Sequence, residues 1–288
     1  LHHYLRQHPN LYLPYEKELG FFKTPEEHFQ TGLDDYLQYF QGVEGKKTGE
    51  ATPGYFRHAD VVPTRMGELY SSSDQPQFIL LFRDPTERAF SHYLHHVGAG
   101  NEDRSLRDAL KYEEEHPEWT RENWRSYFRD GIYADTLETW LDHFSRERFL
   151  FLLTRDLAEC RQETMERVFN FLEVDSTVPV ENNTRKNRAG VLRSETIKSL
   201  LFDPPSWLHS LATTVVPKRR WRKRLRWFVR SLNSKPYEER PTMDPDLEKE
   251  LRRRYESHIR RLEPMIGRDL SSWRVRERRR HYSEIEST

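Results

Sequence analysis

The sequence FILLFRDPTERAFSHY, residues 78–93, indicates a strand that leads directly into a helix. Its first five residues are continuously apolar, which is typical of a strand covered on both faces. Asp84 is a helix-capping residue type, Pro85 suits the first helical position, and Glu87 completes a capping-box pattern. We therefore expect Arg83 at the C-terminal end of a strand, the edge at which open α/β sheets bind their ligands.

Arg83 and Ser91 are residue types that suit an anion site. A guanidinium can hold a phosphate through two parallel hydrogen bonds, and Ser91, two turns into the helix, can add a hydroxyl to the same anion. The alternative is an ion pair of Arg83 with Asp84 or Glu87, while Ser91 faces solvent. The spacing alone does not decide between these two interpretations.

Hydrophobic patterns elsewhere predict more strands and helices in alternation. A short strand is expected within 47–56 and a buried strand at 148–153, and helices are expected at 24–40, 131–144 and 163–174. A final helix begins after Asp244, with the apolar stripe Leu247, Leu251, Tyr255, Ile259 and Leu262. This alternation predicts an α/β fold with a mainly parallel sheet.

The composition limits the classes of function. Lys plus Arg (47) equals Asp plus Glu (47), so no global field attracts nucleic acid or membrane, and we expect no nucleic-acid partner. The single cysteine, Cys160, excludes an internal disulfide and a cysteine-rich metal site, and it favours a reducing, cytoplasmic compartment. The apolar runs 78–82 and 149–153 are too short to span a bilayer.

In combination with other segments, residues 78–93 resemble the 3'-phosphate-binding segment of sulfotransferases that use 3'-phosphoadenosine 5'-phosphosulfate (PAPS). The similarity extends over nearly the whole chain and follows the order of the heparan sulfate and bacterial branch of that family. It is carried by LHHYLRQHPN (1–10), EKELGFF (16–22), GEATPGYF (49–56), GIYADTLETWLDHF (131–144), RFLFLLTRDL (148–157), RVFNFLEV (167–174) and IGRDLSSW (266–273).

The resemblance implies a P-loop-type sulfotransferase fold, in which helices flank a central, mainly parallel sheet and a helical extension follows at the C-terminus. On this basis we expect one sulfotransferase domain at 1–273, with a mainly helical insertion at 182–232. Residues 274–288 would form a basic, disordered tail.

The resemblance also proposes residues for the acceptor side. Glu18 occupies the position of the family's catalytic glutamate, and a carboxylate there could take the proton of an attacking hydroxyl. Lys17, Gly20 and Thr52 are expected to contact the acceptor. The alternative from the residues alone is a solvent-facing Lys17-Glu18 pair with no catalytic role.

On the donor side, the resemblance assigns Arg83 and Ser91 to the 3'-phosphate of PAPS. Lys235 and Arg240 lie in the loop 233–241, where the family closes a basic loop over the same phosphate, although an ordinary helix-entry loop explains them as well. No metal is expected to take part.

Two departures from the animal relatives affect the acceptor. Gly20 stands where the heparan sulfate enzymes have His, and Ala51 stands where they have Lys. A heparan-type acceptor is therefore in doubt, and the bacterial branch fits better. The family's Gly- and Lys-containing loop for the 5'-phosphosulfate precedes the helix that begins here at Leu1, so the sequence predicts an inactive fragment.

Our leading hypothesis is thus sulfuryl transfer from PAPS to a hydroxyl of a glycan, lipid or small metabolite, with Glu18 as general base. One alternative is a kinase-like phosphotransferase, which would normally require magnesium. The other is a non-catalytic module that binds anionic surfaces through residues 218–230, a stretch with eight basic and no acidic residues. The same stretch could give peripheral membrane contact. The oligomeric state is not readable.

Overall fold

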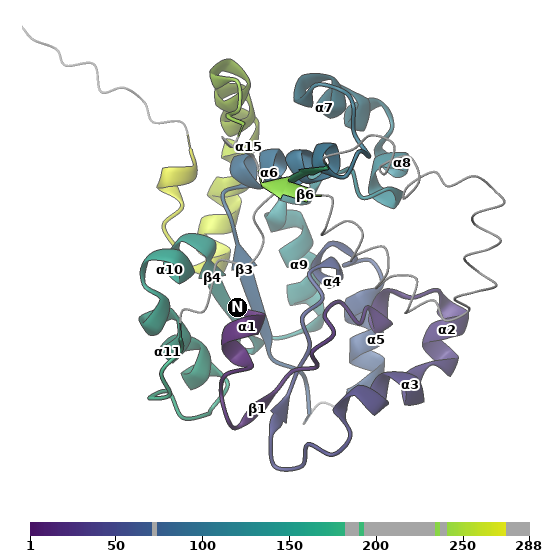
Figure 1. Ribbon diagram of the computed structural model, residues 1–288, viewed down its shortest axis with the longest axis vertical. Helices are drawn as coiled ribbons and strands as arrows, with labels where there is room; N and C mark the ends of the chain where they lie inside the picture. The colour runs from purple at the N-terminus through teal and green to yellow at the C-terminus, as the bar shows by residue number, and fades with distance from the viewer. Residues whose placement is uncertain (71–73, 182–189, 193–233, 237–240, 275–288) are drawn as a thin grey trace, which may run out of the picture. The chain divides into compact units, whose positions relative to one another are not determined.

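The computed structural model describes residues 1–70, 74–181, 190–192, 234–236 and 241–274 (Figure 1). The chain divides into two compact units. The first comprises Leu1–Asp84, Ile132–Asn183 and His258–Leu270, and the second comprises Pro85–Gly131, Thr184–Ser257 and Ser271–Thr288.

Parallel strands form the centre of the first unit. β3 (Phe78–Phe82) pairs in parallel with β4 (Phe149–Leu153), so that Phe78 lies opposite Phe149 and Phe82 opposite Leu153. β1 (Leu11–Tyr12) and β2 (Lys47–Thr48) form a second, short parallel pair. Parallel strands need a crossover between them, and helices provide it here, which confirms the predicted α/β class.

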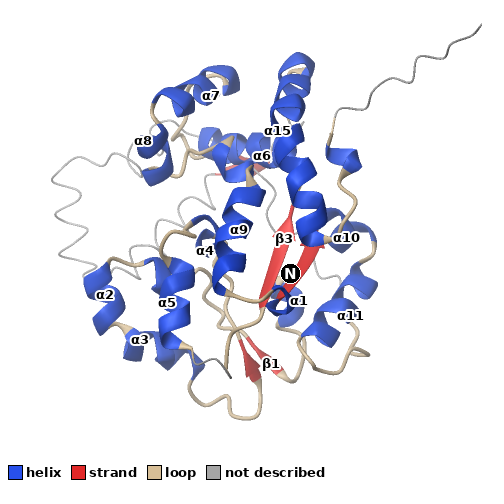
Figure 2. Ribbon diagram, turned by 180° about the vertical axis from the view of Figure 1, so that it is seen from behind, coloured by secondary structure: helices blue, strands red, loops and turns tan. Residues whose placement is uncertain are grey.

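Helices pack on both sides of the β3–β4 pair (Figure 2). On one side, the Phe78 ring of β3 packs edge-on to Trp140 of α9 (Tyr133–His143), with ring centroids 5.2 Å apart. On the other side, Met165, Val168 and Phe169 of α11 (Arg161–Phe171) share a buried cluster with Leu152 of β4. The remaining helices of this unit are α1 (His2–Leu5), α2 (Glu26–Thr31), α3 (Leu33–Leu37), α4 (Gly54–Arg57), α5 (Val62–Leu69), α10 (Thr154–Glu159) and the 3-10 turns η1 (Phe21–Lys23), η2 (Gln38–Phe40) and η4 (Arg146–Arg148).

The prediction that residues 78–82 are buried on both faces is wrong for most of β3. Only Phe82 is buried, and the four preceding residues are partly exposed. Among the described strands β3 pairs with β4 alone, so its other edge has no strand beside it there. β4 is covered more fully, because Phe149, Phe151, Leu152 and Leu153 are all buried.

The described residues of the second unit are mainly helical. It contains α6 (Pro85–Gly98), α7 (Leu106–Glu115), α8 (Pro117–Glu122), the turns η3 (Arg129–Gly131) and η5 (Ser271–Trp273), and the antiparallel strands β5 (Gly190–Leu192) and β6 (Ser234–Pro236). The expectation of a continuous loop at 233–241 is therefore wrong at 234–236, because these residues pair with β5.

The last long helix, α15 (Pro245–Ile266), begins in the second unit and ends in the first. As predicted, Asp244 caps its start: one carboxylate oxygen accepts the Leu247 N–H at 2.9 Å. The predicted apolar stripe is buried along its whole length. The caps and the 3.6-residue period thus defined this helix correctly.

Three expectations concern residues outside the described part of the chain: most of the helical insertion 182–232, the basic stretch 218–230, and the tail from 275 onward. Among the residues that the structure does describe, no helix is both long and apolar enough to cross a bilayer.

Candidate active site

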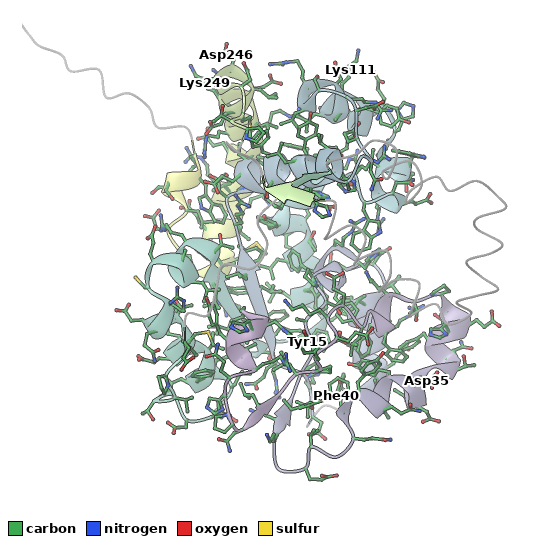
Figure 3. The ribbon with its side chains drawn as sticks, in the orientation of Figure 1. Tyr15, Asp35, Phe40, Lys111, Asp246 and Lys249 are labelled. Carbon is green, nitrogen blue, oxygen red and sulfur yellow. The ribbon has the colours of Figure 1, made fainter. Side chains whose placement is uncertain are left out.

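Glu18 lies in an exposed loop between β1 and η1. The side chains of Tyr15, Glu16, Lys17 and Glu18 are exposed, and Tyr15 is labelled in Figure 3. The Glu18 backbone has φ 58°, in the left-handed region that residues other than glycine rarely adopt. The Glu18 N–H donates to the Ala51 carbonyl at 3.0 Å. The loop thus presents the Glu18 carboxylate to solvent on a backbone that is fixed to a second segment.

Gly20 enables the turn that follows Glu18. Its φ is 73°, and a Cβ added there would lie 3.2 Å from Cε of Lys23. Glycine adopts this conformation without steric cost, whereas other residues do not. A residue other than glycine at position 20 would therefore strain the backbone of this turn.

A second carboxylate, Glu50, lies in the segment to which Glu18 is bonded. It is half-buried and accepts three hydroxyl hydrogen bonds. Oε1 accepts from Tyr36 at 2.9 Å and from Tyr55 at 2.8 Å, and Oε2 accepts from Thr52 at 2.6 Å. Thr52, expected to contact the acceptor, is itself buried and donates its hydroxyl to Glu50.

The surroundings of Glu50 change the pKa values of the nearby tyrosines. Burial, followed by the negative charge of Glu50, raises the pKa of both Tyr36 and Tyr55. The same two causes raise the pKa of Tyr70. All three hydroxyls therefore remain protonated at neutral pH, and those of Tyr36 and Tyr55 donate to Glu50.

Arg65 of α5 fixes the far end of the loop. This buried guanidinium donates to the carbonyls of Phe22 at 3.0 Å and Thr24 at 2.7 Å, and it pairs with Glu26 at 2.5 Å. A buried charge requires such partners, because desolvation without them is costly. The loop is thus held at Ala51 on one side and at Arg65 on the other.

Lys17 contributes positive potential beside Glu18. Burial first, and then the charge of Lys17, lowers the pKa of His2. The His2 ring hydrogen-bonds the Pro14 carbonyl at 3.1 Å, which places α1 against this loop. The expected contact of the exposed Lys17 with the acceptor stays a prediction.

Arg83 immediately follows the C-terminal end of β3, as the sequence predicted. Its side chain is half-buried, and its backbone carbonyl accepts the Tyr133 hydroxyl of α9 at 3.1 Å. Ser91 is half-buried in α6 of the second unit. Whether the two side chains hold one phosphate stays a prediction.

The two remaining candidates are described in part or not at all. Lys235 belongs to β6, where its backbone pairs with Val191, and its side chain is not described. Arg240 lies outside the described residues. Among the residues that are described, no group of three or more His, Cys, Asp and Glu side chains could hold a metal ion.

Residues 27–263 match the family model of the sulfotransferase domain. The chain belongs to the sulfotransferase family. The matched range includes β3, Arg83 and α6, and it begins after Glu18. The crystal structure of a sulfotransferase from Alicyclobacillus acidocaldarius is similar, with a TM-score of 0.66 and 26% identity, covering 94% of this chain and 92% of that one. Because the two structures align over more than nine tenths of both chains, the P-loop-type sulfotransferase fold accounts for nearly all of this chain.

Relatives within the family match over shorter ranges. Membrane-associated sulfotransferase kil1 of Dictyostelium discoideum is 31% identical over 120 residues, or 40% of this chain and 24% of that protein. Mouse heparan sulfate glucosamine 3-O-sulfotransferase 3A1 is 29% identical over 170 residues, or 59% of this chain and 41% of that protein. This chain therefore spans less than half the length of these curated relatives.

Sequence reasoning proposed Glu18, which stays a prediction, and did not single out Glu50. Glu50 stands in GEATPGYF, which carried the resemblance, but the motif gave no sign that the carboxylate collects three hydroxyls. The spacing of Glu50, Thr52 and Tyr55 within six residues was the available signal, because side chains so close can converge on one acceptor. Tyr36 lies on α3 and could not have been assigned to this network.

Proposed function

We propose that this chain transfers a sulfuryl group from PAPS to a hydroxyl acceptor, with Glu18 as general base. The observation that carries the proposal is the exposed Glu18 carboxylate, held on an anchored left-handed backbone in a chain of the sulfotransferase family. Such backbone strain costs on the order of 1–3 kcal/mol and is concentrated at functional sites.

In the proposed step, Glu18 accepts the proton of the acceptor hydroxyl as its oxygen forms a bond to sulfur. The bond between sulfur and the 5'-phosphate oxygen breaks, and adenosine 3',5'-bisphosphate leaves with that oxygen. A positioned base contributes roughly 10²–10⁴-fold to such a step. Glu50 is the weaker candidate for this role, because both of its oxygens already accept hydroxyl hydrogen bonds.

For the donor, we assign the 3'-phosphate to Arg83 and Ser91, with Lys235 and Arg240 as further contacts. A half-buried guanidinium at the C-terminal end of a parallel strand suits a phosphate. Its two parallel N–H groups match the spacing of two phosphate oxygens, and partial burial strengthens the attraction between the two charges. The proposed reaction recruits no metal.

For the acceptor, we propose a hydroxyl of a glycan, a lipid head group or a small metabolite, contacted by Lys17 and by the turn at Gly20. The names of the mouse relatives specify heparan sulfate glucosamine for those proteins. Here Gly20 and Ala51 remove two polar side chains from the neighbourhood of Glu18, which supports a different acceptor. We further propose a cytoplasmic enzyme of the bacterial type, with membrane contact through 218–230 as an open prediction.

The test is transfer of labelled sulfur from PAPS by the full-length protein to a panel of hydroxyl compounds: desulfated glycans, glycolipids and simple phenols. Glu18→Gln keeps the shape of the side chain and removes the base, so we expect kcat to fall by roughly 10²–10⁴-fold. Glu16→Gln, two residues away and exposed, is the matched control and should retain activity. Full turnover by Glu18→Gln would rule out this base.

A further inference from the structure

The Glu50 carboxylate is connected to the loop that carries Glu18 through two separate routes. The first runs through Tyr55, whose hydroxyl donates to Glu50 at 2.8 Å and accepts the Phe22 N–H at 3.4 Å. The second runs through Ala51, whose carbonyl accepts the Glu18 N–H at 3.0 Å. Ala51 is the residue between Glu50 and Thr52, and these two side chains are hydrogen-bonded to each other at 2.6 Å.

The surroundings of these contacts favour a precise arrangement. Thr52, Tyr55, Phe22 and Tyr36 are all buried, so water does not readily replace a hydrogen bond that is lost among them. The Tyr55 ring also packs edge-on to Phe22, with centroids 5.6 Å apart. A left-handed backbone at a residue other than glycine persists only where its surroundings hold it, and at Glu18 the backbone N–H is held by the Ala51 carbonyl.

We infer that Glu50 is a positioning residue: by collecting the Tyr36, Thr52 and Tyr55 hydroxyls, it fixes the segment 50–55 and thereby holds the Glu18 loop, residues 18–22, in its reactive conformation. Glu50 does not touch the substrate in this account. The inference deepens the proposed function, because it presumes that Glu18 is the base.

The expected effect follows from how Glu50 is replaced. Glu50→Gln retains size and shape, but its amide NH₂ can only donate, so it opposes one or more of the three hydroxyl donors. The loop then loses its fixed geometry, and misplacement of a catalytic group by about 1 Å can cost on the order of 10²-fold in rate. We expect a loss of this size in kcat, while the Kd for adenosine 3',5'-bisphosphate stays within about twofold.

Hydrogen exchange provides a readout that does not depend on turnover. In Glu50→Gln the amides of Glu18 and Phe22 should exchange at least about fivefold faster, the factor that corresponds to one lost hydrogen bond of about average strength. Glu27→Gln, an exposed carboxylate on α2, is the matched control and should change neither the exchange nor kcat.

Two tyrosine variants separate the route through Tyr55 from the route through Ala51. They also test the inference if Glu50→Gln does not fold. Tyr55→Phe keeps the ring against Phe22 and removes the hydroxyl that links it to Glu50, so exchange should accelerate at Phe22 more than at Glu18. Tyr36→Phe keeps the ring that stacks on Phe21 and removes a hydroxyl that donates to Glu50 and not to the loop, so it should have a smaller effect on kcat than Tyr55→Phe.

The outcomes distinguish this inference from the proposed function. Unchanged exchange at both amides in Glu50→Gln would overturn the inference whatever the activity, and faster exchange with unchanged kcat would overturn it as well, since the contact would then be merely structural. A wild-type protein that transfers no sulfuryl group would instead contradict the proposed function, which is measured before any Glu50 variant is compared.

Discussion

At the scale of single residues, the surroundings of Glu18 and Glu50 separate two carboxylates by role. Glu18 is exposed and bonded through its backbone, whereas Glu50 is half-buried and bonded through its side chain. A base must have an oxygen available to the acceptor hydroxyl, and a support must have its oxygens occupied. The division of labour that we propose follows from this difference.

Two glycines of the first unit should respond in opposite directions to alanine. Gly20→Ala places a side chain on a left-handed backbone near Lys23, so we expect the free energy of unfolding to fall by about 1–2 kcal/mol. Gly67 is the matched control: it lies within α5, and a Cβ there would meet nothing within 4 Å. Gly67→Ala should raise the same free energy by about 0.5–1 kcal/mol. Urea unfolding measures both, and equal signs would contradict the account of the Glu18 turn.

At the scale of elements, α6 carries a buried histidine, His96, besides Ser91. Nε2 of the buried His96 lies 3.2 Å from Nε2 of His92. Burial first, and then the positive charges of His95 and Arg125, lowers the pKa of His96 to about 4, against the partial opposition of Glu102.

The pH dependence of stability follows from this shift. The pKa of His96 is about 4 in the folded state and about 6.5 in the unfolded chain. Between these pH values the unfolded state therefore binds a proton that the folded state does not bind. The contribution of His96 is present in full above pH 6.5 and is lost as the pH falls toward 4, by about 1.4 kcal/mol per pH unit. His96→Leu should remove this part of the slope in urea unfolding between these pH values. An unchanged slope would contradict the assignment.

The elements of the fold were largely predictable from sequence. The apolar runs at 78–82 and 149–153 predicted β3 and β4, and the Asp244 cap with the apolar stripe that follows it predicted α15. These elements were predictable because apolar runs, caps and periodicity are local signals. The exposure of Phe78–Leu81 was not predictable, since it depends on which strands stand beside β3. In the candidate site, Glu18 was proposed from a motif and stays a prediction, whereas the convergence of Tyr36 on Glu50 could be seen only in the tertiary fold.

At the scale of the whole molecule, the account depends on how the chain binds its donor. The family model and the bacterial neighbour establish the sulfotransferase fold, and the Glu18 loop supports the acceptor chemistry. Neither identifies the nucleotide, for which our proposal relies on Arg83 and Ser91. The central claim is that these two residues recognise the 3'-phosphate, which distinguishes PAPS from nucleotides such as ATP.

Calorimetric titration of the full-length protein with adenosine 3',5'-bisphosphate tests this claim most directly. We predict binding by the wild type without added magnesium, and binding that is weaker by on the order of 10²-fold or more in Arg83→Ala combined with Ser91→Ala, because hydrogen bonds to a charged group contribute about 1.5–3 kcal/mol each. Adenosine 5'-monophosphate, which lacks the 3'-phosphate, should bind both proteins equally weakly. Undiminished affinity in the double variant, or equal wild-type affinity for the two nucleotides, would contradict the account.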